Sequence, residues 1–500
     1  MTLKTKEDVE KYIRENEMDV QSARSNMIAM SIAFSAYANS RKFNGVGFSP
    51  MFCYMAKDDF FSQLTPIKGL EGVSKRVGEL VMKDIDSINK ISKEHVKIEE
   101  EIDEIWASIN LKESDKELIK EFKKMLIAVE KWWFYATYGE DKGMYLGELA
   151  INKFMQTRNI DSLKAREIVN TLAHPNEKSI FTQERIDFLE TALDLLERNV
   201  KKKEIINDKK FDKNYLSYFS KYFFNKTDFN DRRIITKELF AEEICKEIKN
   251  KTKQQVKAEL DKIILDNDKL MRDKHQLDEK INLSGDEKKY ISAVGEMITL
   301  LDYRKRDMMK HFYYIFSILH EFAKRFNVKY GDLSYLTISE LVDFTDGKIK
   351  IESLDLDKRR KKTIIIFQEN SSETFIHGDD AERISGLAMH KGNEIKGNVA
   401  SKNKDNIVRG IARIIKNPAK ENFNSGEILV TSMTRIEYVP LMKKAQAIVT
   451  DEGGIACHAA IVSRELGVPC IIGTKVATRE IKTGDEIEMD MKTGKVKIIK

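Results

Sequence analysis

The 500 residues include 86 basic and 81 acidic side chains, so the formal net charge is only +5 although 33% of the residues are charged. This near balance argues against nucleic-acid binding, which relies on a marked excess of Lys and Arg to neutralise phosphates. Four cysteines without paired spacing exclude a disulfide framework and a thiolate metal centre.

The length predicts about three domains. The longest smooth apolar stretch near the N-terminus, Asn26–Ala38, is too short to span a bilayer. The charged first residues contain no apolar core of a signal peptide. We therefore expect a cytoplasmic protein that has neither a membrane nor a nucleic-acid partner.

The first three-quarters of the chain is predicted to be mostly helical. No glycine occurs between Gly147 and Gly285, as expected for long helices. Gln254–Ile281 has the apolar spacing of an amphipathic helix, and Glu296–Phe326 keeps a three–four apolar repeat that packs on a partner helix. We expect residues 1–350 to form this helical region, with a division into two subdomains near residues 200–250.

Two features of the helical region could form a site for a small-molecule acceptor. The first is the aromatic run Trp132–Tyr138, and the second is a polar stripe at helical spacing that ends at Tyr314. Aromatic runs more often build a core, and a polar stripe is more often an ordinary exposed or hydrogen-bonded face. The residues of this candidate acceptor pocket are Trp132, Trp133, Tyr303, Asp307 and His311.

Residues 351–384 are predicted to be a linker between the helical region and a C-terminal domain. Asp355–Lys362 and Ser371–Asp380 are polar and charge-rich, which is typical of hinges. A domain at residues 385–500 is expected to follow.

The most informative stretch of the sequence surrounds His458. Ala447–Thr450 is predicted to be a buried strand, Gly453 and Gly454 a sharp turn that lets an anion approach the backbone, and Ala459–Leu466 a helix. Gly467 and Pro469 end that helix, a strand follows at Cys470–Ile472, and a hairpin closes the chain at Ile487–Ile499. His458 therefore lies in the first turn of a helix.

The start of a helix favours one kind of histidine chemistry. Unpaired N–H groups and the positive end of the helix dipole disfavour an imidazolium and stabilise an anionic group attached to the ring. A histidine that carries a phosphoryl group needs both properties. Cys457 could instead be an activated nucleophile, but its neighbour His458 points about 100° away around the helix and is poorly placed as its base.

The wider motif resembles a known domain. Gly-Gly-x-x-x-His458-Ala-Ala-Ile-Val-x-Arg-Glu-Leu-Gly-x-Pro469 is similar to the phosphohistidine (swivelling) domain of the phosphoenolpyruvate-utilising enzymes. That family includes phosphoenolpyruvate synthase, pyruvate phosphate dikinase, Enzyme I of the sugar phosphotransferase system and rifampin phosphotransferase. The resemblance covers residues 385–500 and implies an α+β multidomain protein that ends in a β/β/α swivelling domain.

The resemblance also implies roles for particular residues. His458 is the implied phosphoryl carrier, while Gly453, Gly454, Thr434 and Arg464 are the implied supporting residues. Three departures from the family pattern stand out: Ala456 replaces a threonine, Ile436 replaces a proline, and Lys402–Asn406 replaces a glycine-rich turn. Arg325–Leu341 more loosely resembles the connector that precedes this domain in the synthase branch.

A source of phosphoryl groups is not evident in the sequence. Helical, glycine-poor residues 1–350 do not suit a nucleotide-grasping module, and neither a Walker-type loop nor a phosphoenolpyruvate-binding barrel is expected. We expect no directly bound cofactor or metal. The expected partner is an ATP-grasp-like or phosphoenolpyruvate-binding protein that holds ATP or phosphoenolpyruvate with Mg²⁺. Pyruvate or a small hydroxyl compound is the expected acceptor, and the alternative is a non-catalytic regulatory or interaction subunit that retains the domain.

Overall fold

The computed structural model divides the chain into two compact units. Among the described residues, the larger unit comprises Ser22–Ala381, and the smaller unit comprises Leu3–Gln21 and the chain from Glu382 onward. The chain therefore passes from one unit to the other after Gln21 and again after Ala381. The structure describes residues 3–16, 18–39, 41, 49–55, 60–84, 86–136, 142–249, 251–389, 395–402, 406–416, 418, 421–434, 438–451, 457–474 and 476–499.

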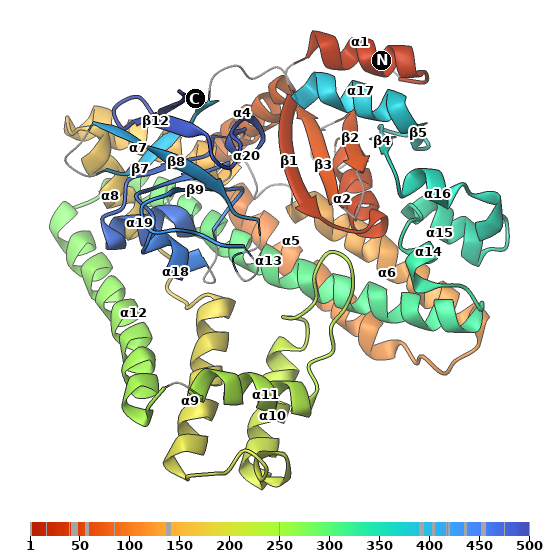
Figure 1. Ribbon diagram of the computed structural model, residues 1–500, viewed down its shortest axis with the longest axis horizontal. Coiled ribbons are helices and arrows are strands. Elements are labelled where there is room, and N and C mark those ends of the chain that lie inside the picture. The colour runs from red at the N-terminus through yellow and green to blue at the C-terminus, as the bar shows by residue number, and fades with distance from the viewer. Residues whose placement is uncertain are drawn as a thin grey trace. The chain divides into compact units, whose positions relative to one another are not determined.

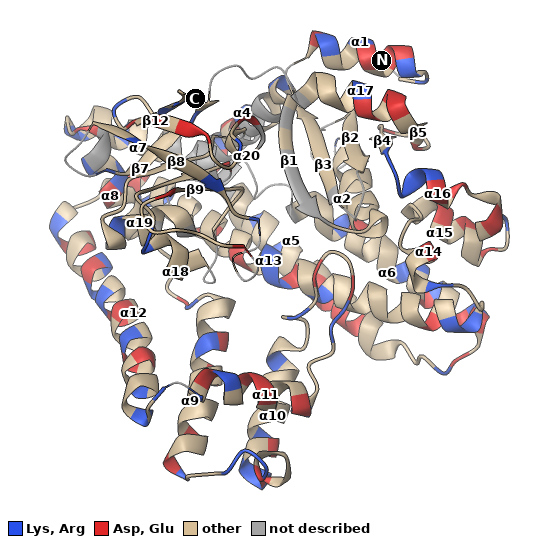
Figure 2. Cartoon of the chain, in the orientation of Figure 1, with Lys and Arg blue, Asp and Glu red and all other residues tan. Residues whose placement is uncertain are grey.

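Helices dominate the larger unit (Figure 1). They are α2 (Met27–Asn39), α4 (Ile67–Lys83), α5 (Asp86–Ser108), α6 (Asp115–Ala136), α7 (Lys142–Arg158), α8 (Ser162–Leu172), α9 (Ile180–Glu197), α10 (Lys209–Tyr222), α11 (Lys237–Ile248), α12 (Lys253–Ile281), α13 (Gly285–Arg325), α14 (Tyr330–Leu333), α15 (Ile338–Thr345) and α16 (Leu356–Arg359). The helix predicted at Gln254–Ile281 is confirmed as α12. Acidic and basic side chains alternate along it (Figure 2).

Helix α13 is longer than the predicted segment Glu296–Phe326. It begins at Gly285 because Ser284 and Glu287 form a capping box, in which each side chain accepts a hydrogen bond from the other residue's backbone N–H. Its first half packs in a core with α7 and α8, and its second half packs in a larger core with α2, α5 and α6. Helices α9 to α12 enclose a third core.

A five-stranded sheet, which the sequence did not lead us to expect, lies within the mostly helical region. Its strand order is β1-β3-β2-β4-β5. The strands are β1 (Met18–Arg24), β2 (Met51–Met55), β3 (Phe60–Pro66), β4 (Thr363–Phe367) and β5 (Thr374–His377). Strand β2 lies between β3 and β4 and pairs antiparallel with both, so residues more than 300 positions apart in the sequence are neighbours.

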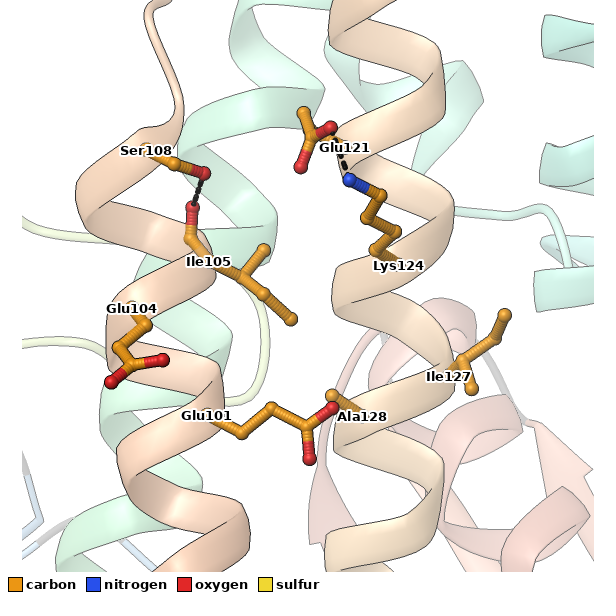
Figure 3. A pocket seen from close by; sticks show the side chains of 8 residues that line it. All are labelled: Glu101, Glu104, Ile105, Ser108, Glu121, Lys124, Ile127 and Ala128. Carbon is orange, nitrogen blue, oxygen red and sulfur yellow. Dashed lines mark hydrogen bonds and ion pairs between the residues drawn. The ribbon is translucent and has the colours of Figure 1, made fainter.

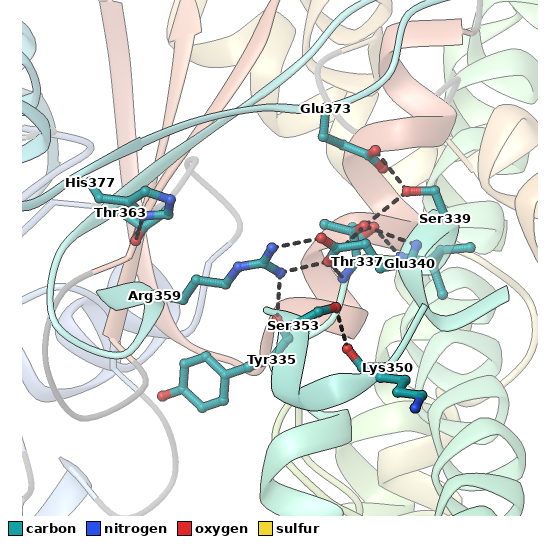
Figure 4. Close-up of polar contacts among 12 residues, drawn as sticks. Tyr335, Thr337, Ser339, Glu340, Lys350, Ser353, Arg359, Thr363, Glu373 and His377 are labelled. Atoms are coloured by element: carbon teal, nitrogen blue, oxygen red, sulfur yellow. Dashed lines mark hydrogen bonds and ion pairs between the residues drawn. The ribbon is translucent and has the colours of Figure 1, made fainter. Parts of the chain in front are cut away.

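The segment expected to be a linker, residues 351–384, differs from that prediction. Its apolar run Thr363–Phe367 is a fully buried strand in the centre of the sheet. Arg359 donates two hydrogen bonds of 2.6 Å to the carboxylate of Glu340 on α15 (Figure 4). Arg360 forms an ion pair with Asp332. The expected hinge at Asp355–Lys362 is therefore anchored inside the larger unit, and the boundary between the units falls beyond it, after Ala381.

The smaller unit is built on an eight-stranded sheet of order β6-β13-β12-β8-β9-β10-β11-β7. The strands are β6 (Ile395–Lys396), β7 (Asn398–Ser401), β8 (Ile407–Ile414), β9 (Ile428–Thr431), β10 (Ala447–Thr450), β11 (Cys470–Ile472), β12 (Glu486–Asp490) and β13 (Lys495–Ile498). Strands β8 to β11 pair in parallel and the remaining pairs are antiparallel. The predicted strands β10 and β11 and the closing hairpin are confirmed.

Short helices complete this unit. They are α1 (Lys6–Glu15), α18 (Val439–Met442), α19 (His458–Leu466) and α20 (Ala477–Glu480), together with most of α17 (Gly378–Met389), which begins just before the boundary. Glu10 on α1 and Arg383 on α17 form an ion pair of 2.6 Å. The sheet contributes to two apolar cores, one shared with α20 and the other with α18 and α19.

Candidate functional site

His458 is the first residue of α19, as predicted. Cys457 is the N-cap residue, with φ −72° and ψ 162°, and its side chain forms no capping hydrogen bond. Cys457 therefore provides no side-chain cap for the N–H groups of the first turn, and such groups at the start of a helix favour an anion. Gly453 and Gly454, predicted to support a phosphoryl group, lie outside the described residues.

At its C-terminal end, α19 stops at a glycine cap, as the sequence predicted. Gly467 adopts the left-handed conformation with φ 65°, and the N–H of Val468 donates to the carbonyl of Ser463 at 2.9 Å. Strand β11 then begins at Cys470, which has no exposed surface. Burial raises the pKa of the Cys470 thiol to about 12, so this sulfur is not a nucleophile at neutral pH.

Arg464 and Thr434 were both predicted to support the phosphoryl group. Arg464 lies six residues after His458, about 9 Å further along the helix axis. Its Nε donates to the carbonyl of Ala400 at 2.8 Å, so it ties α19 to β7. Thr434 is buried after strand β9. The contacts of Arg464 support a structural role at the end of the helix away from His458.

Asp451, which the sequence reasoning did not select, is held at the end of β10. Its carboxylate accepts hydrogen bonds from the Thr474 hydroxyl at 3.1 Å and from the backbone N–H of Thr478 at 3.1 Å, and it also contacts the Thr478 hydroxyl. Burial raises the pKa of Asp451. Asp451 thus fixes the end of the strand from which the chain continues towards His458. The sequence signal that could have identified it is an acidic residue shortly before two glycines.

The residues of the candidate acceptor pocket fall in two places. Trp132, Trp133, Asp307 and His311 are buried, whereas Tyr303 is partly exposed and bonds to Glu177 at 3.1 Å. Asp307 and His311 are therefore buried rather than exposed, and the hydrogen bond from His311 to Glu99 on α5 fits the hydrogen-bonded form of the expected face.

The aromatic run and the polar stripe meet inside the larger unit. The ring centroids of Trp132 and His311 lie 4.6 Å apart in an edge-on arrangement, and those of Trp132 and His95 lie 5.1 Å apart. Helices α5, α6 and α13 thus contribute to one buried polar cluster. Its members are the buried His95, Glu99, Trp132, Trp133, Asp307, Lys310 and His311, together with the partly exposed Asp103 and Arg306.

Charged groups in this cluster are paired with one another. Glu99 accepts from Nε2 of His311 at 2.8 Å and also pairs with Lys310, whose Nζ lies 2.7 Å from Asp103. Asp307 pairs with Arg306. Burial raises the pKa of Asp307 to about 6, and burial lowers the pKa of His95 to about 4, so that imidazole is neutral at pH 7.

A surface groove of about 410 Å³ lies between α5 and α6 (Figure 3). Side chains from both helices face across it, including Glu101 and Glu104 from α5 and Lys124 from α6. Lys124 is already paired with Glu121 at 2.7 Å, so the groove offers a mainly acidic wall.

The described ranges contain neither a metal-binding cluster nor a membrane-spanning helix. Within these ranges, no three His, Cys, Asp or Glu side chains are arranged to hold a metal ion. No helix in the same ranges combines the length and the apolar character needed to cross a membrane.

Comparison with known proteins identifies the domain that contains His458. Residues 423–494 match the family described as PEP-utilising enzyme, mobile domain. This segment of the chain, which contains His458, is therefore similar to the mobile domain of the phosphoenolpyruvate-utilising enzymes.

Phosphoenolpyruvate synthases are among the relatives with similar sequences. The probable phosphoenolpyruvate synthase of Staphylothermus marinus is 58% identical over 93 residues, which are 18% of this chain and 11% of the relative. The phosphoenolpyruvate synthase of Pyrococcus furiosus is 57% identical over 76 residues, 15% of this chain and 9% of the relative. The chain therefore spans only about a tenth of the length of these relatives.

Among solved structures, a chain of Thermococcus kodakaraensis aconitase X aligns over 22% of this chain and 100% of its own length. The sequence identity is 19% and the TM-score is 0.18, a score too low for any argument.

Proposed function

We propose that this chain is the phosphoryl-carrying component of a phosphotransferase, with His458 as the carrier. The observation that carries the proposal is a histidine at the first position of α19, inside the segment that matches the mobile domain. Backbone N–H groups at the start of a helix stabilise an anionic phosphoramidate on the ring.

The proposed reaction has two steps. One ring nitrogen of His458 attacks the phosphorus of a donor, forming an N–P bond while the bond to the donor's leaving oxygen breaks. An oxygen of the acceptor then attacks the same phosphorus, and the electrons of the broken N–P bond return to the imidazole. Catalysis of both steps depends mainly on positioning and electrostatics.

Both the donor and the acceptor belong to the proposal. An ATP-grasp-like or phosphoenolpyruvate-binding partner is the proposed donor, with ATP or phosphoenolpyruvate and Mg²⁺ on that partner. Pyruvate or a small hydroxyl compound is the proposed acceptor. The names of the relatives support the phosphoenolpyruvate-linked chemistry.

Phosphoramidate, a small chemical donor of phosphoryl groups to imidazole, tests the carrier without any partner. We expect the chain to gain one phosphoryl group that is lost in acid and retained in base, as an N–P bond requires. His458→Ala should abolish this label, and Cys457→Ser should retain it. Labelling that survives His458→Ala but not Cys457→Ser would replace the histidine with the cysteine as carrier. A chain that takes up no label on His458 would support the alternative of a regulatory subunit.

A further inference from the structure

The buried polar cluster contains several polar atoms that lack a hydrogen-bond partner among the described residues. These atoms are Nε2 of His95, Nε1 of Trp132, Nε1 of Trp133, Oδ2 of Asp307 and Nδ1 of His311. All five side chains are more than nine-tenths buried. A buried polar atom without a partner costs about 1–3 kcal/mol, so a concentration of five in one place calls for an explanation.

These atoms come from three helices and lie close together. Trp132 on α6 contacts the rings of His95 on α5 and His311 on α13, with centroids 5.1 Å and 4.6 Å away. The Trp133 ring lies 5.4 Å from Trp132. Asp307 is one helical turn before His311 and faces the same side of α13. One small molecule could therefore reach several of these atoms at once.

Hydrogen-bond chemistry assigns donors and acceptors in the cluster. A carboxylate only accepts, so the 2.8 Å contact with Glu99 places a proton on Nε2 of His311. Each indole Nε1 only donates. The cluster therefore presents donors at Trp132 and Trp133 together with an acceptor, the unpartnered Oδ2 of Asp307.

Charge in the cluster disfavours an ionic ligand. Lys310 is paired with Glu99 and Asp103, and Arg306 is paired with Asp307. A carboxylate or a phosphate would have to disrupt one of these buried pairs, at a cost of several kcal/mol. A neutral molecule avoids that cost. A hydroxyl group both donates and accepts, which matches the mixture of atoms, and the surrounding rings suit a planar body.

We infer that the cluster between α5, α6 and α13 is an enclosed binding site for a small neutral hydroxyl compound. The hydroxyl accepts from an indole N–H and donates to Oδ2 of Asp307. Asp307 and His311 have no exposed surface, so entry requires α5 or α6 to move away from α13. Only the naming of this compound as the phosphoryl acceptor rests on the proposed function, since binding itself is independent of His458.

The three tryptophans of the chain make the site directly observable. Trp132 and Trp133 belong to the cluster, and Trp106 stacks on Tyr314 at 4.5 Å, next to it. Incorporation of 5-fluorotryptophan gives three ¹⁹F resonances, which single Trp→Phe variants assign. Phenol is the probe, toluene is its counterpart without the hydroxyl group, and pyruvate is the charged probe. We expect phenol to shift the Trp132 and Trp133 resonances saturably, and toluene to bind roughly tenfold more weakly because it forms neither hydrogen bond.

Two variants separate a specific site from general loosening of the core. Trp132→Phe keeps an aromatic ring but removes an indole donor, so it should weaken phenol binding, followed at the Trp133 resonance, by roughly tenfold. Tyr303→Phe on α13 removes only the bond to Glu177 and should leave binding unchanged. Equal binding of phenol and toluene, a response to pyruvate alone, or no response of either resonance to phenol would overturn the inference in the unsubstituted protein, even if Trp132→Phe does not fold. Labelling of His458 by phosphoramidate is measured separately, so the two ideas fail independently.

Discussion

The start of α19 and the buried polar cluster differ in the origin and the pairing of their polar groups. At α19 the relevant donors belong to the backbone, and no Cys457 side-chain bond caps them. In the cluster the polar groups are side chains from three helices, and most of their charges are paired away from water. The contrast separates two tasks: a helix end suits a transient anion, whereas an enclosed set of side chains can select one shape and one pattern of hydrogen bonds.

The largest expected change comes from breaking the buried charges. Lys310→Met leaves Glu99 and Asp103 without their shared cation, and we expect a loss of about 3–5 kcal/mol in the free energy of unfolding of the larger unit. Urea titration followed by tryptophan fluorescence measures it. The matched control is Lys246→Met, which removes an exposed pair with Glu242 and should leave the free energy of unfolding nearly unchanged. Similar losses in the two variants would mean that the cluster is wetter than the structure indicates.

A second prediction concerns acid and applies to both units. Hydrogen bonds from Arg413 lower the pKa of Glu427 to about 2, and hydrogen bonds from Arg158 do the same for Glu287. Each ionised carboxylate stabilises its unit by about 2 kcal/mol above the unfolded pKa near 4.5, and this is lost as the pH falls towards 2.

Glu427→Gln and Glu287→Gln test that prediction. Their deficits in unfolding free energy relative to the unsubstituted protein should be largest near pH 6 and should shrink by pH 3. A deficit that stays constant over this range would show that ionisation of the carboxylate is not the source of the stability.

The smallest predicted effect isolates the end of the carrier helix. Gly467→Ala places a side chain at φ 65° with no atom within 4 Å of the new Cβ, so only backbone conformation opposes it. We expect a loss of about 1 kcal/mol. Gly285→Ala, at a helical position with equally open space, should instead be neutral or slightly stabilising. Thermal unfolding of the two variants measures the difference, and equal effects would contradict the left-handed cap.

Local signals made the region around His458 predictable from the sequence. Gly467, Pro469 and the apolar run Ala447–Thr450 each act within a few residues, and the structure confirms the strands and the helix they indicate. The motif pointed to the mobile-domain family, which the comparison supports over residues 423–494. The phosphoryl role of His458 remains a prediction.

Distant pairings explain what the sequence did not reveal. Strand β4 was read as part of a linker because its partner, β2, lies more than 300 residues earlier, and neither short strand has a helix or strand period of its own. Likewise the burial of the polar stripe on α13 was not predicted, because no local sequence signal shows that Glu99 on α5 will cover His311. Sequence periodicity predicts an apolar face well, but it does not predict a charged face that is buried by opposite charges.

The double passage of the chain between its units has a consequence for the order of synthesis. The smaller unit takes its first residues, Leu3–Gln21, from the beginning of the chain and the remainder from Glu382 onward. A ribosome therefore releases the whole larger unit before the smaller unit can be completed, and α1 must wait for α17 to form the pair between Glu10 and Arg383. A single proteolytic cut near residue 381 would likewise leave α1 bound to the severed domain by non-covalent contacts alone.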